Sequence, residues 1–310
     1  MDIHRTHIAP GQHELVKIPA GRLPTGNPVQ VQVEVFRSEN PGPTVLVLAG
    51  VHGDEVNGVE ILRQARSLGL FERLQSGSVI AVPILNVYGF INFTREVPDG
   101  KDINRSFPGN SRGSLASRLA RIISRKILPV VDVGIDLHTG AGMTYNYPQI
   151  RYSRGHAPSL AYARQFGAPF LLAKPAIRKS LRRIALDADT PILVFEGGEN
   201  LRYDATSIAK GLAGLQRFLA AQGMLMETSG PEPVRHLTKS SWMRAPRAGM
   251  FQWYKPSGHQ VEADEPLGII HDPLGNHQVT LYAPRSGYIV GHNNATVISQ
   301  GDALFHIGYE

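Results

Sequence analysis

The chain has 310 residues, and its 42% hydrophobic and 19% charged content is ordinary for a globular protein with a real core, which argues against disorder. The formal net charge is +6, but the densest basic stretch, 178–183, is short, so we expect no nucleic-acid partner. Cysteine is absent, which excludes disulfides and thiol chemistry and leaves His, Asp and Glu to bind any metal. The polar N-terminus and the lack of a run of roughly 20 apolar residues predict a soluble, cytoplasmic protein with no membrane partner.

The first predicted elements alternate between strand and helix. Apolar residues occupy every second position over 29–36, which predicts a half-buried strand. The continuous apolar run 44–48 predicts a strand buried on both faces. Apolar residues at helical spacing follow over 56–68, and Gly69 lies where a C-terminal cap is expected.

The same alternation continues along the chain. We predict buried strands over 79–85, 130–137 and 191–195, a helix whose cap is Ser114, and an amphipathic helix over 208–219. Strands that alternate with helices indicate an α/β fold with a mixed, largely parallel sheet flanked by helices.

The pattern changes after Gly223. We interpret Ser229–Pro233 as a linker, and from about 241 short strand-like pieces alternate with turns such as 255–258 and 284–287. This change in the sequence pattern predicts two domains, a catalytic α/β domain over 1–234 and a small all-β domain over 235–310. The second resembles a biotinyl/lipoyl-type domain but has no lysine on the expected hairpin, 272–277, so we expect a cap over the active site rather than a carrier.

Three potential metal ligands follow predicted strands. His52 and Glu55 lie three residues apart in a strand-to-helix turn, and His138 follows the strand that ends at Leu137. Ligands gather at the carboxyl ends of parallel strands. A set of two histidines and one glutamate can hold a catalytic zinc with one position open to water. The alternative is a capping carboxylate beside hydrogen-bonded histidines.

The segment 102–109 places Asn104 beside Arg105 in a loop. An amide and a guanidinium fork together suit a carboxylate of a substrate. Arg95 could polarise a carbonyl group. The alternative for each arginine is a solvated side chain on a loop.

Glu196 follows the apolar strand 191–195 and precedes two glycines. A carboxylate at the end of a buried strand needs a partner or a function, because burying it alone is costly. Next to an activated water it would act as general base and then return the proton to the departing amine. The alternatives are a structural ion pair of Glu196 with an arginine, or Glu199 as the active carboxylate.

Four motifs together carry a resemblance to a known family. They are His52-Gly53-Asp54-Glu55, the segment 102–109 (Asp-Ile-Asn-Arg-Ser-Phe-Pro-Gly), Asp136-Leu137-His138 and Phe195-Glu196-Gly197-Gly198. In this order they resemble the succinylglutamate desuccinylase/aspartoacylase family, whose members are related to zinc carboxypeptidases.

The resemblance implies a role for each residue. His52, Glu55 and His138 would bind one Zn²⁺ per chain, and Glu196 would be the catalytic acid/base. Arg95 would polarise the scissile carbonyl, Asn104 and Arg105 would bind a substrate carboxylate, and Asp136 would orient a metal ligand. Candidates for substrate selection are Arg182, Arg183 and Tyr288.

The resemblance also implies a zinc-dependent hydrolase that cleaves the amide bond of a small N-acylated, carboxylate-bearing amine or amino acid. The partner is then a small-molecule substrate, and a homo-oligomer is possible. Two alternatives stay open: a metallocarboxypeptidase that acts on peptides, and a catalytically silent binding protein of the same fold.

Overall fold

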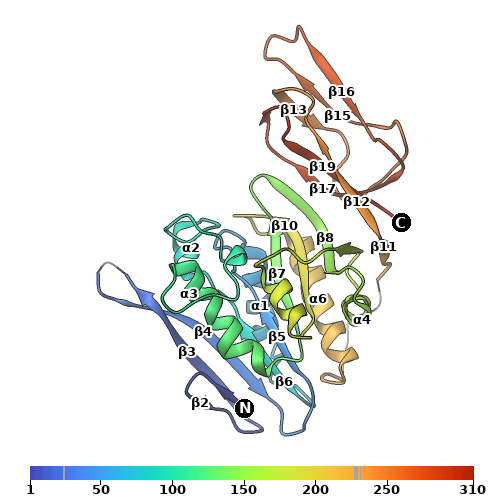
Figure 1. Cartoon of the computed structure of the whole chain (residues 1–310). Helices are drawn as coiled ribbons and strands as arrows, with labels where there is room; N and C mark the ends of the chain where they lie inside the picture. The colour runs from blue at the N-terminus through green and yellow to red at the C-terminus, as the bar shows by residue number, and fades with distance from the viewer. Residues whose placement is uncertain (24, 227–229, 231) are drawn as a thin grey trace.

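The computed structural model describes every residue except 24, 227–229 and 231 (Figure 1). The predicted linker Ser229–Pro233 therefore lies partly outside the described residues. The helices are α1 (Val56–Ser67), α2 (Val87–Asn92), α3 (Leu115–Ile122), α4 (Ala157–Phe166), α5 (Leu181–Asp187) and α6 (Ala205–Ala221), with short 3₁₀ or π turns at Ile103–Arg105, Ile123–Ile127 and Leu128–Val130.

Strands occupy much of the remaining chain. They are β1 (Asp2–Ile3), β2 (Thr6–His7), β3 (His13–Arg22), β4 (Pro28–Arg37), β5 (Thr44–Leu48), β6 (Ser78–Val82), β7 (Val133–Gly140), β8 (Thr144–Ser153), β9 (Phe170–Lys174), β10 (Ile192–Glu199), β11 (Arg235–Leu237), β12 (Lys239–Arg244), β13 (Gly249–Trp253), β14 (Gln260–Val261), β15 (Pro266–His271), β16 (Gln278–Tyr282), β17 (Gly287–Asn293), β18 (Val297–Ile298) and β19 (Ala303–Tyr309).

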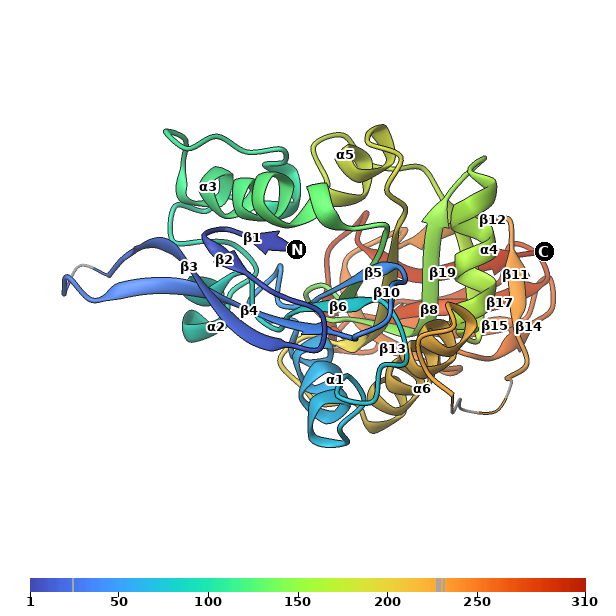
Figure 2. The ribbon, with the colours of Figure 1, turned by 90° about the horizontal axis from the view of Figure 1, so that it is seen from below.

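A mixed sheet forms the centre of the molecule, as the sequence predicted. Strands β6, β5, β7 and β10 run parallel in this order, β4 and then β3 add antiparallel strands at one side, and β8 adds one beyond β10. Helices α1 and α6 cover one face and α3 and α5 the other (Figure 2). Alternate residues of β5 enter two separate cores, as expected of a strand buried on both faces. Val45 lies in the core on the side of α1 and α6, and Leu46 lies in the core on the side of α3 and α5.

The sheet does not stop at the predicted domain boundary. Strand β8 pairs with β17, and β9 pairs with β11, so β17, β19 and β12 extend the same sheet. A separate four-stranded sheet of β16, β15, β13 and β18 packs against β17 and β19 of the large sheet, and the core between them includes Phe251, Leu267 and Phe305 (Figure 1). The division into 1–234 and 235–310 stays a prediction, and here 235–310 is named the C-terminal region.

Several strand limits differ from the prediction. β6 ends at Val82 because Pro83 has no N–H for the ladder, and β7 starts at Val133 because residues 128–130 form a turn that contains Pro129. β7 and β10 run on to Gly140 and Glu199, so His138 and Glu196 lie within strands rather than after them. Strand β8 was not predicted. No helix among the described residues is both long and apolar enough to cross a membrane.

Candidate metal centre and substrate cavity

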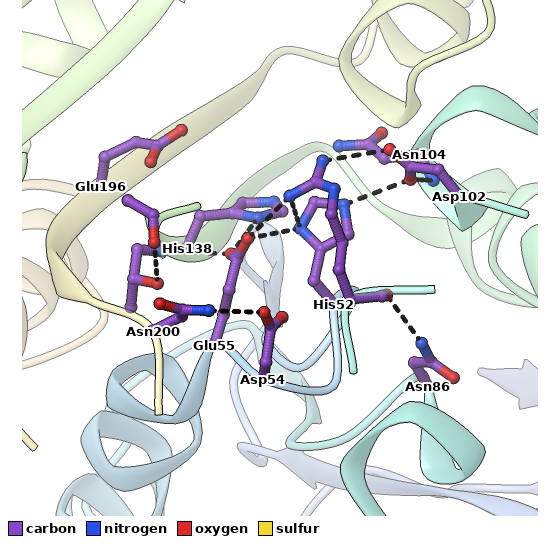
Figure 3. Close-up of polar contacts among 12 residues, drawn as sticks. His52, Asp54, Glu55, Asn86, Asp102, Asn104, His138, Glu196 and Asn200 are labelled. Carbon is purple, nitrogen blue, oxygen red and sulfur yellow. Dashed lines mark hydrogen bonds and ion pairs between the residues drawn. The ribbon is translucent and has the colours of Figure 1, made fainter. Parts of the chain in front are cut away.

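The three predicted metal ligands meet at one point. His52 and Glu55 lie in the turn between β5 and α1, and His138 lies on β7, which is the parallel neighbour of β5. Glu55 Oε1 lies 2.6 Å from His52 Nδ1, and Glu55 Oε2 lies 2.7 Å from His138 Nδ1. One ligand atom from each residue lies within 4.8 Å of the others (Figure 3). All three side chains are buried.

A glycine lets this turn take its path. A Cβ on Gly53 would lie 1.9 Å from the backbone carbon of Gly89 in α2, so any other residue here would push the turn away from α2. The turn that carries His52 and Glu55 is therefore fixed by direct backbone packing.

Each histidine has a carboxylate at its other ring nitrogen. His52 Nε2 lies 3.2 Å from Asp102 Oδ1, and His138 Nε2 lies 2.8 Å from Asp136 Oδ2. Metal-binding histidines commonly have such a partner, which fixes the ring orientation and makes the metal-facing nitrogen more basic. Asp136 lies at ion-pair distance from His138 Nε2 but without hydrogen-bond geometry, and its orienting role stays a prediction. Sequence reasoning gave Asp102 no such role, although it begins the quoted Asn-Arg motif.

Charge is closely balanced around Glu55. Burial alone would raise the pKa of Glu55, but His52 and His138 outweigh burial and hold that pKa well below its usual value. Arg95 adds a cation, with Nη1 3.1 Å from Glu55 Oε1 and Nη2 3.0 Å from Asp102 Oδ2. Burial opposes the charge of Arg95, and these two carboxylates nevertheless raise its pKa. Two imidazoles and an ionised carboxylate are donors that fit a divalent cation, so the group could hold a metal.

The group opens into a cavity of about 270 Å³. Most of the lining residues have polar or charged side chains. The lining comprises His52, Glu55, Arg95, Asn104, Arg105, Asp136, His138, Thr139, Ala141, Thr144, Asn146, Arg151, Ile177, Ser180, Arg182, Val194, Glu196 and Trp242.

Asn104 and Arg105 both line this cavity, on the side of Asp102. The Asn104 side-chain oxygen accepts a hydrogen bond of 2.9 Å from the Leu181 N–H at the start of α5, so the amide NH₂ is the group left for a ligand. Arg105 is exposed, and its Nη1 donates to the Asn104 backbone carbonyl at 2.8 Å.

Glu196 lines the cavity from the opposite side of the metal group (Figure 3). It lies on β10 in register with His138 on β7. Arg151 Nη1 donates to Glu196 Oε1 at 2.7 Å, and Asn146 Nδ2 donates to Oε2 at 2.9 Å. The ion pair that sequence reasoning kept as an alternative is thus present at a carboxylate that also faces the cavity. Glu199 accepts a hydrogen bond from Asn294 and is not part of the lining.

Arg182 is the best placed of the three residues considered for substrate selection. It is 8% exposed, its Nη2 donates to the Pro175 carbonyl at 2.7 Å, and its buried Nη1 has no hydrogen-bond partner. Burial, followed by the charge of Arg151, lowers the pKa of Arg182 to about 10. Arg183 pairs with Asp187 on the surface of α5, and neither Arg183 nor Tyr288 belongs to the cavity lining.

The C-terminal region contributes one residue to the lining. Trp242 on β12 faces the cavity and stacks on His306, with ring centroids 4.6 Å apart. Asn146 and Arg151, which contact Glu196 and were not among the predicted site residues, both lie on β8.

Comparisons with known proteins agree with this geometry. The family model of the succinylglutamate desuccinylase/aspartoacylase catalytic domain matches residues 41–222. An N-alpha-acetyl-L-2,4-diaminobutyric acid deacetylase of Halomonas elongata is 28% identical over 94% of this chain and 90% of its own length.

Two solved structures share the whole fold. A succinylglutamate desuccinylase/aspartoacylase from Rhodobacter sphaeroides superposes with a TM-score of 0.86 at 27% identity, over 100% of this chain and 98% of its own. The ectoine utilization protein EutE (DoeB) from Ruegeria pomeroyi superposes with a TM-score of 0.85 at 24% identity, over 96% and 95% of the two chains. The family and the named deacetylase are amide-cleaving hydrolases, which favours a deacylase over a carboxypeptidase or a silent binding protein. The chain belongs to the succinylglutamate desuccinylase/aspartoacylase family.

Proposed function

We propose that the protein is a zinc-dependent deacylase that hydrolyses the amide bond of a small N-acylated amine or amino acid with a free carboxylate. The observation that carries the proposal is the convergence of His52, Glu55 and His138 at the end of a cavity that also contains four arginines. A metal-binding group next to anion-binding side chains suits a substrate that carries its own negative charge.

His52, Glu55 and His138 would hold the metal. Nitrogen and carboxylate ligands in a chain without cysteine support zinc as the ion. Bound zinc supplies Lewis-acid polarisation and makes water at the site more acidic. Asp102 and Asp136 would hold the two imidazole rings so that their Nδ1 atoms face the ion.

Glu196 would act as general base and then as general acid. Its carboxylate would accept the proton of the attacking water and pass it to the nitrogen of the departing amine. Arg95 would stabilise the negative charge that develops on the acyl oxygen, because its guanidinium lines the cavity beside the metal-binding group.

The carboxylate of the substrate would bind to arginine side chains. Asn104 and Arg105 offer an amide NH₂ and a guanidinium on one side of the cavity, and Arg182 offers a buried N–H without a partner. A substrate fixed in this way would present its acyl carbon to the water in a reaction that is intramolecular in effect.

A substrate panel together with Glu196→Gln tests the proposal. The panel begins with Nα-acetyl-L-2,4-diaminobutyrate, because the Halomonas relative is named as a deacetylase of that compound. It continues with N-acetyl, N-succinyl and N-formyl amino acids and short peptides. We expect turnover of one N-acyl amino acid and none of the peptides, and a fall of about 10²–10⁴-fold in kcat for Glu196→Gln. Undiminished kcat in this variant would remove Glu196 from its role. A cytoplasmic location and a homo-oligomer stay predictions.

A further inference from the structure

We propose that Arg151 is a positioning residue for this reaction, which holds the Glu196 carboxylate in the orientation needed for proton transfer. The inference rests on the proposed function, in which Glu196 exchanges a proton with the substrate. It assigns a role to strand β8, whose side chains enter the cavity between the metal group and the C-terminal region.

The pairing of β8 with β10 places Arg151 within reach of Glu196. The strands are antiparallel, with Glu196 opposite Gln149 and Val194 opposite Arg151. Arg151 is therefore the diagonal neighbour of Glu196 on the same face, a distance that long side chains can span. The contact is made by Arg151 Nη1, which donates to Glu196 Oε1 at 2.7 Å.

A bulge in β8 brings a second donor to the same carboxylate. Between Glu196 and Gly198 the strand β10 advances two residues, while β8 moves three, from Gln149 to Asn146. In a regular strand, residues three positions apart point to opposite faces, so Asn146 would point away from Glu196. The extra residue of a bulge brings the Asn146 side chain back to the face of Glu196. Asn146 Nδ2 donates to Glu196 Oε2 at 2.9 Å, so each carboxylate oxygen has one donor from β8.

Arg151 is itself fixed from the C-terminal region. Its Nε donates to Gln149 Oε1 at 3.3 Å, and Gln149 Nε2 donates to the Val290 carbonyl of β17 at 3.1 Å. Gln149 is fully buried. A continuous row of hydrogen bonds thus connects the C-terminal region to the carboxylate, through Gln149 and Arg151.

This arrangement has a mechanistic consequence. A proton acceptor works only when its oxygen lies within hydrogen-bonding distance of the proton, and a free glutamate side chain samples several rotamers. Removal of Arg151 would release one oxygen of Glu196 and lower kcat. If Arg151 instead bound the substrate carboxylate directly, its removal would raise KM and leave kcat in place.

A double-mutant cycle separates these roles. The variants are Arg151→Ala and Arg151→Lys, each in the wild-type and the Glu196→Gln background, assayed as the zinc-loaded enzyme on the best N-acyl amino acid of the panel. The matched control is Arg154→Ala, which also removes one arginine charge. Arg154 is exposed, lies just after the end of β8, and donates through Nη2 to the Ala173 carbonyl.

We expect Arg151→Ala to lower kcat by about 10–100-fold with KM within about 3-fold of wild type, and Arg151→Lys to recover part of the loss. In the Glu196→Gln background Arg151→Ala should cost less than about 3-fold, because no carboxylate is left to position. Arg154→Ala should leave both constants unchanged.

Two results would overturn the inference: a rise in KM with unchanged kcat, or an equal loss of kcat in both backgrounds. Should Arg151→Ala fail to fold, Asn146→Ala in the same cycle makes the same test, since it removes the other donor to Glu196. Failure of the proposed function looks different, because Glu196→Gln alone would then retain full kcat.

Discussion

The two ends of the cavity differ in the charged side chains that line them. At the metal end (His52, Glu55, His138, Asp102 and Asp136) carboxylates and imidazoles contact one another at 2.6–3.2 Å. At the arginine end (Asn146, Arg151, Arg182 and Glu196) Arg151 pairs with the Glu196 carboxylate, and Arg182, whose Nη2 donates to a backbone carbonyl, keeps a buried N–H without a partner. The first end contains three carboxylates, balanced by two imidazoles and the neighbouring Arg95, and the second contains two guanidiniums and one carboxylate. This difference supports the proposal that one end binds a metal ion and the other binds the carboxylate of the substrate.

Metal removal should have the largest effect, because it acts on the metal end alone. Dialysis against a chelator should lower turnover by at least about 10³-fold, since metal stabilisation of a transition state is worth several kcal/mol. Zinc should restore it. Calorimetry with the amino-acid product should still detect binding at the arginine end of the metal-free protein. Full turnover in a preparation without metal would contradict the distinction between the two ends.

Arg182→Ala changes the arginine end alone, just as metal removal changes the metal end alone. Hydrogen bonds to charged groups contribute about 1.5–3 kcal/mol, so we expect KM to rise by about 10–100-fold while zinc content stays at the wild-type level. The control is Arg183→Ala, which changes the adjacent arginine that pairs with Asp187 on the helix surface. Equal KM values for the two variants would assign the substrate carboxylate elsewhere.

Trp242→Ala should have a smaller effect on KM, because Trp242 contributes an uncharged aromatic side chain to the cavity lining. We expect KM to rise by about 3–10-fold for the best substrate, the loss of about 0.5–1.5 kcal/mol of aromatic contact. Steady-state kinetics on the substrate panel measures it. Unchanged KM across the whole panel would show that Trp242 does not contact the substrate.

A change at Lys174 tests the stability of the protein, and we expect it to have the smallest effect on activity. Its Nζ donates to Ser240 and lies 3.1 Å from His306 Nε2. Burial, followed by Arg151 and Arg154, lowers the pKa of Lys174 from the ordinary 10.5 to about 8. Between these values the unfolded chain binds more protons than the folded one, so stability should rise as the pH increases from 8 to 10.5.

Lys174→Met should remove this rise. After a discount for partial exposure, the difference in unfolding free energy between wild type and variant should change by about 1–2 kcal/mol between pH 7.5 and pH 10. Urea unfolding at the two pH values measures it. An identical pH dependence in both proteins would mean that Lys174 is not perturbed.

The sequence predicted the metal end far better than the arginine end. His52, Glu55 and His138 occur in short motifs next to apolar runs, and the carboxyl ends of neighbouring parallel strands meet at one edge. Their convergence could therefore be predicted without coordinates. The position of Glu196 at the cavity could be predicted for the same reason.

The arginine end depends on β8, a strand whose sequence does not show a typical strand pattern. β8 contains Pro148 and buries Asn146 and Gln149, so it shows neither the alternation nor the apolar run of a typical strand. A bulge then sets which face Asn146 takes, and pairing with β17, far away in the sequence, anchors the strand. Long-range pairing of this kind leaves no local signal. The contact of Trp242 with the cavity was missed for the same reason.

Zinc content is the most direct test of the account. Wild type and Glu196→Gln, purified in the presence of zinc, should each contain about one zinc per chain by elemental analysis, and Glu55→Ala should contain less than about one tenth, because Glu55 lies between both histidines. Wild-type zinc content in a folded Glu55→Ala protein would contradict the central claim that His52, Glu55 and His138 hold the catalytic metal.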